Sequence, residues 1–157
     1  MSLLNNLQQL CIEKGVSIAV AESCTAGLIA SKLTTLPGSS SFFKGGVVAY
    51  QNEIKTKILG VSQSIIDEKT EVSAEVVKQM AKSILEKFDT NFAIATTGYA
   101  GPAGGTNKNP IGTVFIAIAS VVGVVVSRFV FLGDRQSVVN QASESALSLL
   151  YNEIKKQ

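Results

Sequence analysis

Histidine and tryptophan are both absent from this 157-residue chain, which contains only 2 cysteines. Without histidine there is no Ser-His-Asp or Cys-His catalysis, and no imidazole can act as an acid or a base. A zinc or iron site with histidine ligands is excluded too, and Cys11 and Cys24 alone cannot build a cysteine-rich zinc site. Any catalysis must therefore use other side chains. We also expect the reaction to need no metal and no cofactor.

A surplus of charge is also missing, since 14 basic residues face 12 acidic ones. The net charge of +2 lacks the basic excess of nucleic-acid-binding proteins, so we predict no nucleic-acid partner. Two cysteines do not suggest a disulfide framework, which favours a cytoplasmic location. Residues 1–15 predict an amphipathic helix that ends at Gly15, and they lack the basic start of a signal peptide.

One segment, residues 111–132, contains a single charged residue, Arg128, over about the length that a bilayer requires. Its residues are mainly Val, Ile, Phe and Thr, which favour strands, and Ser120 to Gly123 can form a reversal. We therefore predict a hairpin of two buried strands, 112–119 and 124–131, and no membrane partner.

The rest of the chain alternates between helical and strand patterns, without repeats or a domain boundary. Further helices are expected at 24–34, 52–59, 73–88 and 134–151, and further strands at 16–21, 46–50 and 91–96. This order predicts an α/β fold, as one domain over residues 1–157. We expect three layers, α/β/α, on a mixed sheet with a late antiparallel hairpin.

The stretch AESCTAG, residues 21–27, places a serine where a predicted strand meets a predicted helix. Backbone N–H groups at such a point could stabilise an oxyanion if Ser23 attacked a carbonyl group. From this stretch alone, an ordinary helix cap is the more common role for such a serine. Cys24 is a rival nucleophile, although a lone cysteine of this kind is more often a small buried apolar residue.

The stretch GGVVAYQNEIK, residues 45–55, brings a tyrosine and a lysine about one helical turn apart. In the absence of histidine, a desolvated lysine is the natural general base for a serine, because burial lowers its pKa. The Tyr50 hydroxyl could relay the proton. The alternative is that Lys55 lies on an exposed helix face, like Lys57.

The stretch from Thr96 to Thr106 carries four glycines after a predicted strand, which allows a ligand to approach the backbone closely. It fits neither the phosphate-binding loop nor the dinucleotide fingerprint. Arg135, at a predicted helix start, suggests a phosphate or carboxylate ligand, or else an ion pair with Asp134 or Glu144. Ser41 and Lys44 match the S-x-x-K motif, but the glycines that follow exclude the helix which that motif needs.

Five ordered motifs resemble those of the CinA C-terminal domain family, whose characterised members are nicotinamide-nucleotide amidases of the PncC type. The likeness runs from about residue 3 to residue 150, in the form of a stand-alone domain. The motifs are AESCTAG, the turn Pro37–Ser40, GGVVAYQNEIK, TGYAGPAGGT and FLGDR.

The resemblance implies an α/β/α fold and hydrolysis of nicotinamide mononucleotide to nicotinate mononucleotide and ammonia, as in pyridine nucleotide salvage and NAD metabolism. It implies catalysis by Ser23, Lys55 and Tyr50. The substrate-binding residues expected with it are Cys24, Thr25, Ser40, Gly46, Thr97, Gly98, Ala100, Gly101, Gly105 and Arg135. The chain departs from the family pattern at Ala26, Tyr99, Ala103 and Val139, the last standing where the family usually has an arginine.

The mechanism expected is that neutral Lys55 accepts the Ser23 proton, Ser23 attacks the carboxamide carbon, and water later cleaves the acyl-enzyme. N–H groups near Cys24 and Thr25 would hold the oxyanion, and Tyr50 would help to protonate the ammonia. Two alternatives remain: a catalytically silent ligand-binding domain linked to competence or DNA damage, and an amidohydrolase for another amide. A pyridine nucleotide is the expected partner, and a homo-oligomer is left open.

Overall fold

The computed structural model describes residues 2–157, in which five strands form one mixed sheet with the order β2-β1-β3-β4-β5. β1 runs parallel to β2 and β3, whereas β4 is antiparallel to β3 and β5. This arrangement confirms the predicted mixed sheet with a late hairpin. The strands are β1 (Ile18–Glu22), β2 (Phe43–Val48), β3 (Phe92–Gly98), β4 (Thr113–Ser120) and β5 (Gly123–Val130).

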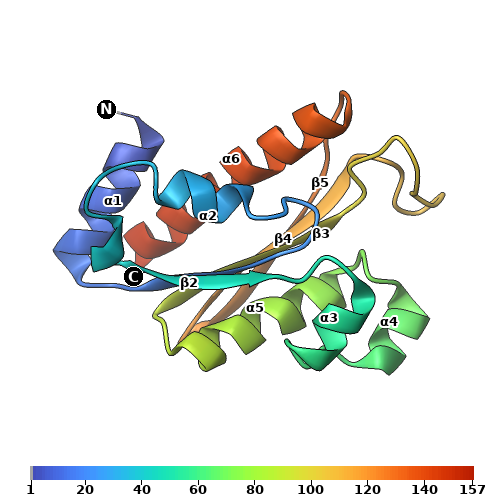
Figure 1. The fold of residues 1–157 in the computed structure, drawn as a ribbon, viewed down its shortest axis with the longest axis horizontal. Coiled ribbons are helices and arrows are strands. Elements are labelled where there is room, and N and C mark those ends of the chain that lie inside the picture. The colour runs from blue at the N-terminus through green and yellow to red at the C-terminus, as the bar shows by residue number, and fades with distance from the viewer. Residues whose placement is uncertain (1) are drawn as a thin grey trace.

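Helices cover both faces of the sheet, as Figure 1 shows, which confirms the three-layer prediction. One face carries α1 (Leu3–Lys14), α2 (Leu28–Leu33) and α6 (Arg135–Lys156). The other carries α4 (Gln63–Lys69) and α5 (Ala74–Phe88), while α3 (Asn52–Lys57) follows β2. A short 3-10 turn, η1 (Ser39–Ser41), leads into β2.

The alternation of side chains along the central strands explains the two cores. In β1, Ile18 and Val20 face the layer of α1, α2 and α6, whereas Ala19 and Ala21 face α5. β3 and β4 place further alanines on that second face. Since alanine is small, α5 packs closely on the sheet with its apolar stripe, which includes Met80.

The apolar segment 111–132 forms the predicted hairpin, in which Ser120 of β4 pairs with Gly123 of β5. β4 is buried along its whole length, since β3 and β5 flank it and helices cover both of its faces. Within residues 2–157, no helix is both long and apolar enough to cross a bilayer.

Several boundaries differ from those expected. α4 lies in a stretch for which no helix was predicted, and the Ser62 hydroxyl caps it. β2 starts at Phe43, three residues before the predicted strand, and α6 continues past Tyr151 to Lys156. α2 begins at Leu28, although a helix was expected from Cys24, and this difference bears directly on the site.

Candidate active site

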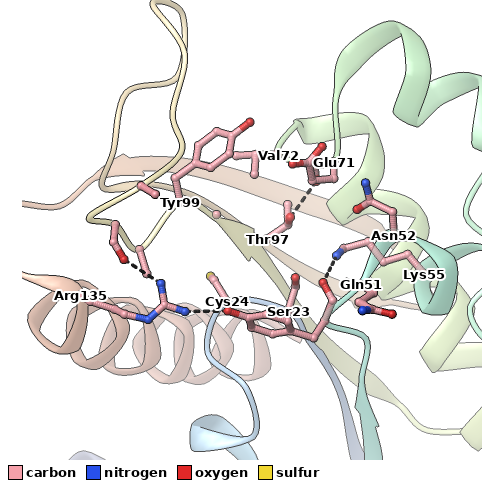
Figure 2. Close-up of a pocket in the computed structure, with 15 residues that line it drawn as sticks. Ser23, Cys24, Gln51, Asn52, Lys55, Glu71, Val72, Thr97, Tyr99 and Arg135 are labelled. Atoms are coloured by element: carbon pink, nitrogen blue, oxygen red, sulfur yellow. Dashed lines mark hydrogen bonds between the residues drawn. The ribbon is translucent and has the colours of Figure 1, made fainter.

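The candidate site lies where the carboxyl ends of the parallel strands meet, the usual position of ligand sites in open α/β sheets. Ser23 follows β1 directly, Lys55 lies on α3 after β2, and Thr97 is near the end of β3. All three line one cavity of about 390 Å³. Figure 2 shows the Ser23 and Lys55 side chains directed toward this cavity.

Ser23 is held by its main chain rather than by its side chain. Its N–H group donates to the Thr96 carbonyl oxygen at 3.1 Å, which ties the end of β1 to β3. The Ser23 hydroxyl makes no hydrogen bond with any residue from 2 to 157, and the residue is 7% exposed. The side chain therefore does not cap a helix and is available to a ligand in the cavity.

The expected helix at Cys24 was wrong, because residues 24–27 form a turn instead. Ala26 and Gly27 adopt left-handed conformations, with φ of 48° and 96°, which a continuous helix does not allow. Ala26 stands where the resemblance leads us to expect glycine, and its positive φ explains that preference physically. Ser23 therefore does not lie at the N-terminus of a helix, and no helix dipole acts directly on its hydroxyl.

The side chain of Glu22 binds the free N–H groups at the start of α2. Its two carboxylate oxygens accept hydrogen bonds from the N–H groups of Ile29 and Ala30, at 2.9 and 3.0 Å. Glu22 is completely buried, so these bonds supply the polar partners that its carboxylate needs away from water. The contact anchors α2 to β1 and thereby fixes both ends of the turn that contains Ser23.

Cys24 lines the cavity beside Ser23 but is unsuited to nucleophilic attack. Burial raises the pKa of the Cys24 thiol to about 12, against weaker opposing effects from Thr96 and Lys55. The thiol is therefore protonated at neutral pH, and only the thiolate is strongly nucleophilic. This favours the interpretation of Cys24 as a small buried residue.

Lys55 is 1% exposed, so it does not lie on an open helix face as Lys57 does. Its Nζ donates a hydrogen bond of 3.0 Å to the main-chain carbonyl oxygen of Tyr50. Burial lowers the pKa of Lys55, while the charge of Glu71 acts in the opposite direction. A lysine in this state loses its proton more readily than one in water and is suited to act as a base.

Tyr50 lines the cavity, and its contact with Lys55 is made by its main-chain carbonyl oxygen, not by its hydroxyl group. The hydroxyl accepts a hydrogen bond of 2.6 Å from Arg135 Nη2. Arg135 Nη1 donates to the carbonyl oxygen of Gly101 at 2.7 Å. Neither Asp134 nor Glu144 pairs with Arg135 in residues 2–157: Asp134 caps α6, and Glu144 pairs with Lys32.

The cavity gathers many, but not all, of the expected binding residues. Ser40 precedes β2 in η1, at the opposite end of that strand, and Gly46 lies inside β2. Gly105 does not line the cavity either, and Thr25 lines a neighbouring one, with its hydroxyl 2.9 Å from that of Thr96. The expected binding residues that do line the cavity are Cys24, Thr97, Gly98, Ala100, Gly101 and Arg135.

A second cavity, of about 740 Å³, lies next to the first and shares Cys24, Tyr50 and Arg135 with it. Since Tyr50 and Arg135 line both, their hydrogen bond forms part of the wall between them. Val139 lines the second cavity only. No group of three or more Cys, Asp or Glu side chains in the described residues is placed to share a metal ion.

Residues 1–154 of the chain match the sequence pattern of the CinA C-terminal domain family. The chain belongs to the CinA C-terminal domain family. A CinA-like protein of Flavobacterium psychrophilum is 47% identical over 150 residues, which cover 96% of this chain and 36% of that protein. The chain spans about a third of the length of the curated relatives that it matches.

Solved structures of CinA proteins are similar to this chain over nearly its whole length. A CinA superfamily protein from Klebsiella pneumoniae has a TM-score of 0.95 and 32% identity, covering 99% of this chain and 97% of that one. The competence/damage inducible protein CihA from Agrobacterium tumefaciens has a TM-score of 0.88 and 33% identity, with coverage of 96% and 94%. The fold of this CinA domain is therefore shared with experimentally determined structures.

Sequence reasoning missed several residues of the CinA domain that line the cavity. Gln51 and Asn52 lie between Tyr50 and Lys55, and their position in that motif could have indicated them. Glu71 lies far from every motif in the sequence, just before α5, and no local pattern identifies it. Its main-chain carbonyl oxygen accepts a hydrogen bond of 2.7 Å from the Thr97 hydroxyl, which joins this distant segment to β3.

Proposed function

We propose that this CinA domain is a nicotinamide-nucleotide amidase, which hydrolyses the carboxamide of nicotinamide mononucleotide to nicotinate mononucleotide and ammonia. The observation that carries this proposal is the burial of Lys55 in the cavity that Ser23 lines. A buried lysine with a lowered pKa next to an unengaged serine supports acyl transfer without histidine.

The reaction begins when neutral Lys55 accepts the proton of the Ser23 hydroxyl and the oxygen attacks the carboxamide carbon. The negative charge then moves to the carbonyl oxygen. Within residues 2–157, the N–H groups of Cys24 and Thr25 donate to no other residue, so both are available to stabilise this charge. The rigid turn after β1 keeps both groups in place without reorganisation.

The C–N bond breaks when the leaving nitrogen receives a proton. Protonated Lys55 supplies it, since it holds the proton taken from Ser23, whereas the Tyr50 hydroxyl is bonded to Arg135. Ammonia leaves, and Lys55 then removes a proton from water, which attacks the acyl-enzyme. The C–O bond to Ser23 breaks, and its oxygen regains a proton from Lys55.

Arg135 supports the nucleotide part of the proposal. Its guanidinium lines the cavity, and a phosphate is a preferred partner of arginine. The Tyr50 hydroxyl, which accepts from Arg135, still has its own proton to donate to a phosphate oxygen. Gly98 and Gly101 line the same cavity, where they would contact the ribose.

The test measures ammonia and nicotinate mononucleotide released from nicotinamide mononucleotide by four proteins: the unchanged chain, Ser23→Ala, Lys55→Ala and Lys57→Ala. We expect Ser23→Ala and Lys55→Ala to lose at least about 100-fold in kcat. Lys57→Ala is the matched control, because Lys57 is on the same helix but exposed. Full activity of Ser23→Ala would refute the assignment of the nucleophile.

A second candidate function follows from the names of the relatives, several of which are called competence- or damage-inducible proteins. In that case the domain would bind a nucleotide ligand without turning it over and act through partners. Binding of nicotinamide mononucleotide without ammonia release would favour this candidate. A panel of other small amides would identify an amidohydrolase with a different substrate.

A further inference from the structure

Glu71 is the acidic residue of the cavity: of the lining residues within 2–157, it alone has a carboxylate side chain. It is partly buried and lies between α4 and α5. Figure 2 shows Glu71 and Arg135 on different sides of the cavity. The cavity therefore has a negative group on one side and a positive group on another.

The segment that carries Glu71 is held firmly. The Thr97 hydroxyl donates to the Glu71 carbonyl oxygen at 2.7 Å, and Asn109 Nδ2 donates to the carbonyl oxygen of Val72 at 3.3 Å. Val72 is 1% exposed, and the Ser73 hydroxyl caps α5 immediately afterwards. Since the main chain is held at Glu71, Val72 and Ser73, the residue that carries the carboxylate is part of an anchored segment and not the end of a loose surface loop.

Glu71 also has no cation in direct contact with its carboxylate within residues 2–157. Its carboxylate forms no salt bridge and accepts no hydrogen bond from any residue in the described part of the chain. Its field reaches the catalytic end of the cavity, because it raises the pKa of Lys55 against the effect of burial. A partly buried carboxylate without a partner is a natural place for a cationic part of a ligand.

We propose that Glu71 is a specificity-determining residue that makes the site select amides on a permanently cationic ring, with an anionic group at Arg135. The inference rests on the proposed function, in which the carboxamide lies at Ser23. An oxidised pyridinium ring carries a positive charge next to that carboxamide, and a phosphate lies further along the same molecule. Such a substrate matches the order of charges in the cavity, whereas the reduced dihydropyridine ring is neutral.

A different role for Glu71 predicts a different result. If it acted only on the pKa of Lys55, its loss would change catalysis but not the relative binding of the two ring forms. Binding of nicotinamide mononucleotide and of its reduced form therefore separates the two roles. Both carry the same carboxamide, ribose and phosphate, so the charge of the ring is the main difference between them.

The experiment measures the Kd of both compounds by calorimetry with Ser23→Ala, which prevents turnover. The same measurement is made with Ser23→Ala combined with Glu71→Gln, and with Ser23→Ala combined with Glu68→Gln. Glu68 is a matched control, because its side chain is 70% exposed, it lies outside the cavity, and the net charge changes equally.

With Glu71→Gln we expect the Kd of the oxidised compound to rise on the order of tenfold, and that of the reduced compound to stay within about twofold. Glu68→Gln should change neither. Equal changes for both compounds, no change for either, or no binding at all would overturn the inference. Ammonia release by the unchanged chain tests the proposed amidase activity separately. If ammonia is released but Glu71→Gln does not change the preference for the charged ring, only the role of Glu71 is refuted. If Glu71 controls that preference but no ammonia is released, only the amidase activity is refuted.

Discussion

The hydroxyl group of Tyr50 accepts a hydrogen bond of 2.6 Å from the guanidinium of Arg135, which lies 85 residues further along the chain. The same guanidinium donates to the carbonyl oxygen of Gly101, so one cation joins the segment after β2, the loop after β3 and the start of α6. Through its main-chain carbonyl, Tyr50 also accepts from Lys55. One residue thus connects the proposed base to the proposed phosphate end of the site.

Tyr50→Phe separates these two connections. It removes the hydrogen bond from Arg135 but keeps the carbonyl oxygen that Lys55 contacts. We expect KM for nicotinamide mononucleotide to rise about three- to tenfold, because Arg135 loses a positioning partner, with kcat within about twofold. Steady-state kinetics checks this. A large loss of kcat at unchanged KM would instead indicate that the hydroxyl transfers a proton.

The rate of the proposed reaction should rise with pH as Lys55 loses its proton. Burial lowers the pKa of Lys55 below the usual 10.5, and the charge of Glu71 raises it again. Glu71→Gln should therefore shift the acidic limb of the kcat profile to lower pH, because less proton affinity remains at Lys55. Measuring kcat between about pH 5 and about pH 10 checks the direction of this shift. A shift to higher pH would contradict the role of Lys55 as the base.

Both cysteines should be inert toward alkylation in the folded chain. Burial raises the pKa of Cys11 and of Cys24 to about 12, so at pH 8 only about one thiol in 10,000 is ionised. We expect no label from iodoacetamide within an hour-scale incubation and full retention of ammonia release, as judged by intact mass and activity. The same chain unfolded in urea should take up two labels. Fast labelling of Cys24 with loss of activity would make it the rival nucleophile again.

Glu22→Gln should lower the free energy of unfolding by about 1–3 kcal/mol. A glutamine has one acceptor oxygen, whereas the two carboxylate oxygens of Glu22 serve the N–H groups of Ile29 and Ala30. Urea unfolding at neutral pH measures the change. Glu53→Gln is a suitable control, because Glu53 is exposed and its carboxylate pairs with Lys57 on the surface. Equal stability of the two variants would show that the buried contact contributes nothing.

Gly46→Ala distinguishes packing from ligand binding. A Cβ atom at this position would lie 2.2 Å from the Val20 carbonyl oxygen, which is main chain and cannot rotate away. We expect a loss of about 1–3 kcal/mol in the free energy of unfolding, with KM unchanged below the unfolding transition. A higher KM at full stability would show instead that Gly46 contacts the substrate, as the family resemblance implies.

Most of the secondary structure was predictable, because its determinants are local. The leucine spacing of residues 3–10 and Gly15 define α1, and the β-branched run defines the hairpin of β4 and β5. The start of α2 was not predictable in this way. It depends on left-handed residues at 26 and 27 and on Glu22, whose side chain binds N–H groups seven and eight residues later.

The sequence by itself determined which chemistry is excluded: with no histidine, any acyl transfer must activate its nucleophile without an imidazole, and a lysine is the natural base for it. It also determined the family, through motifs that keep their order along the chain. Neither conclusion required knowledge of contacts between distant residues.

Only the tertiary structure decided the environment and the contacts of the proposed catalytic groups. The pKa of Lys55 depends on the exclusion of water and on Glu71, and the Tyr50 hydroxyl has its partner on α6. It also decided that Ser40 and Gly46 lie away from the cavity. Solvent exclusion and electrostatic fields arise from segments far apart in the chain, so a local motif can name a residue but not its environment.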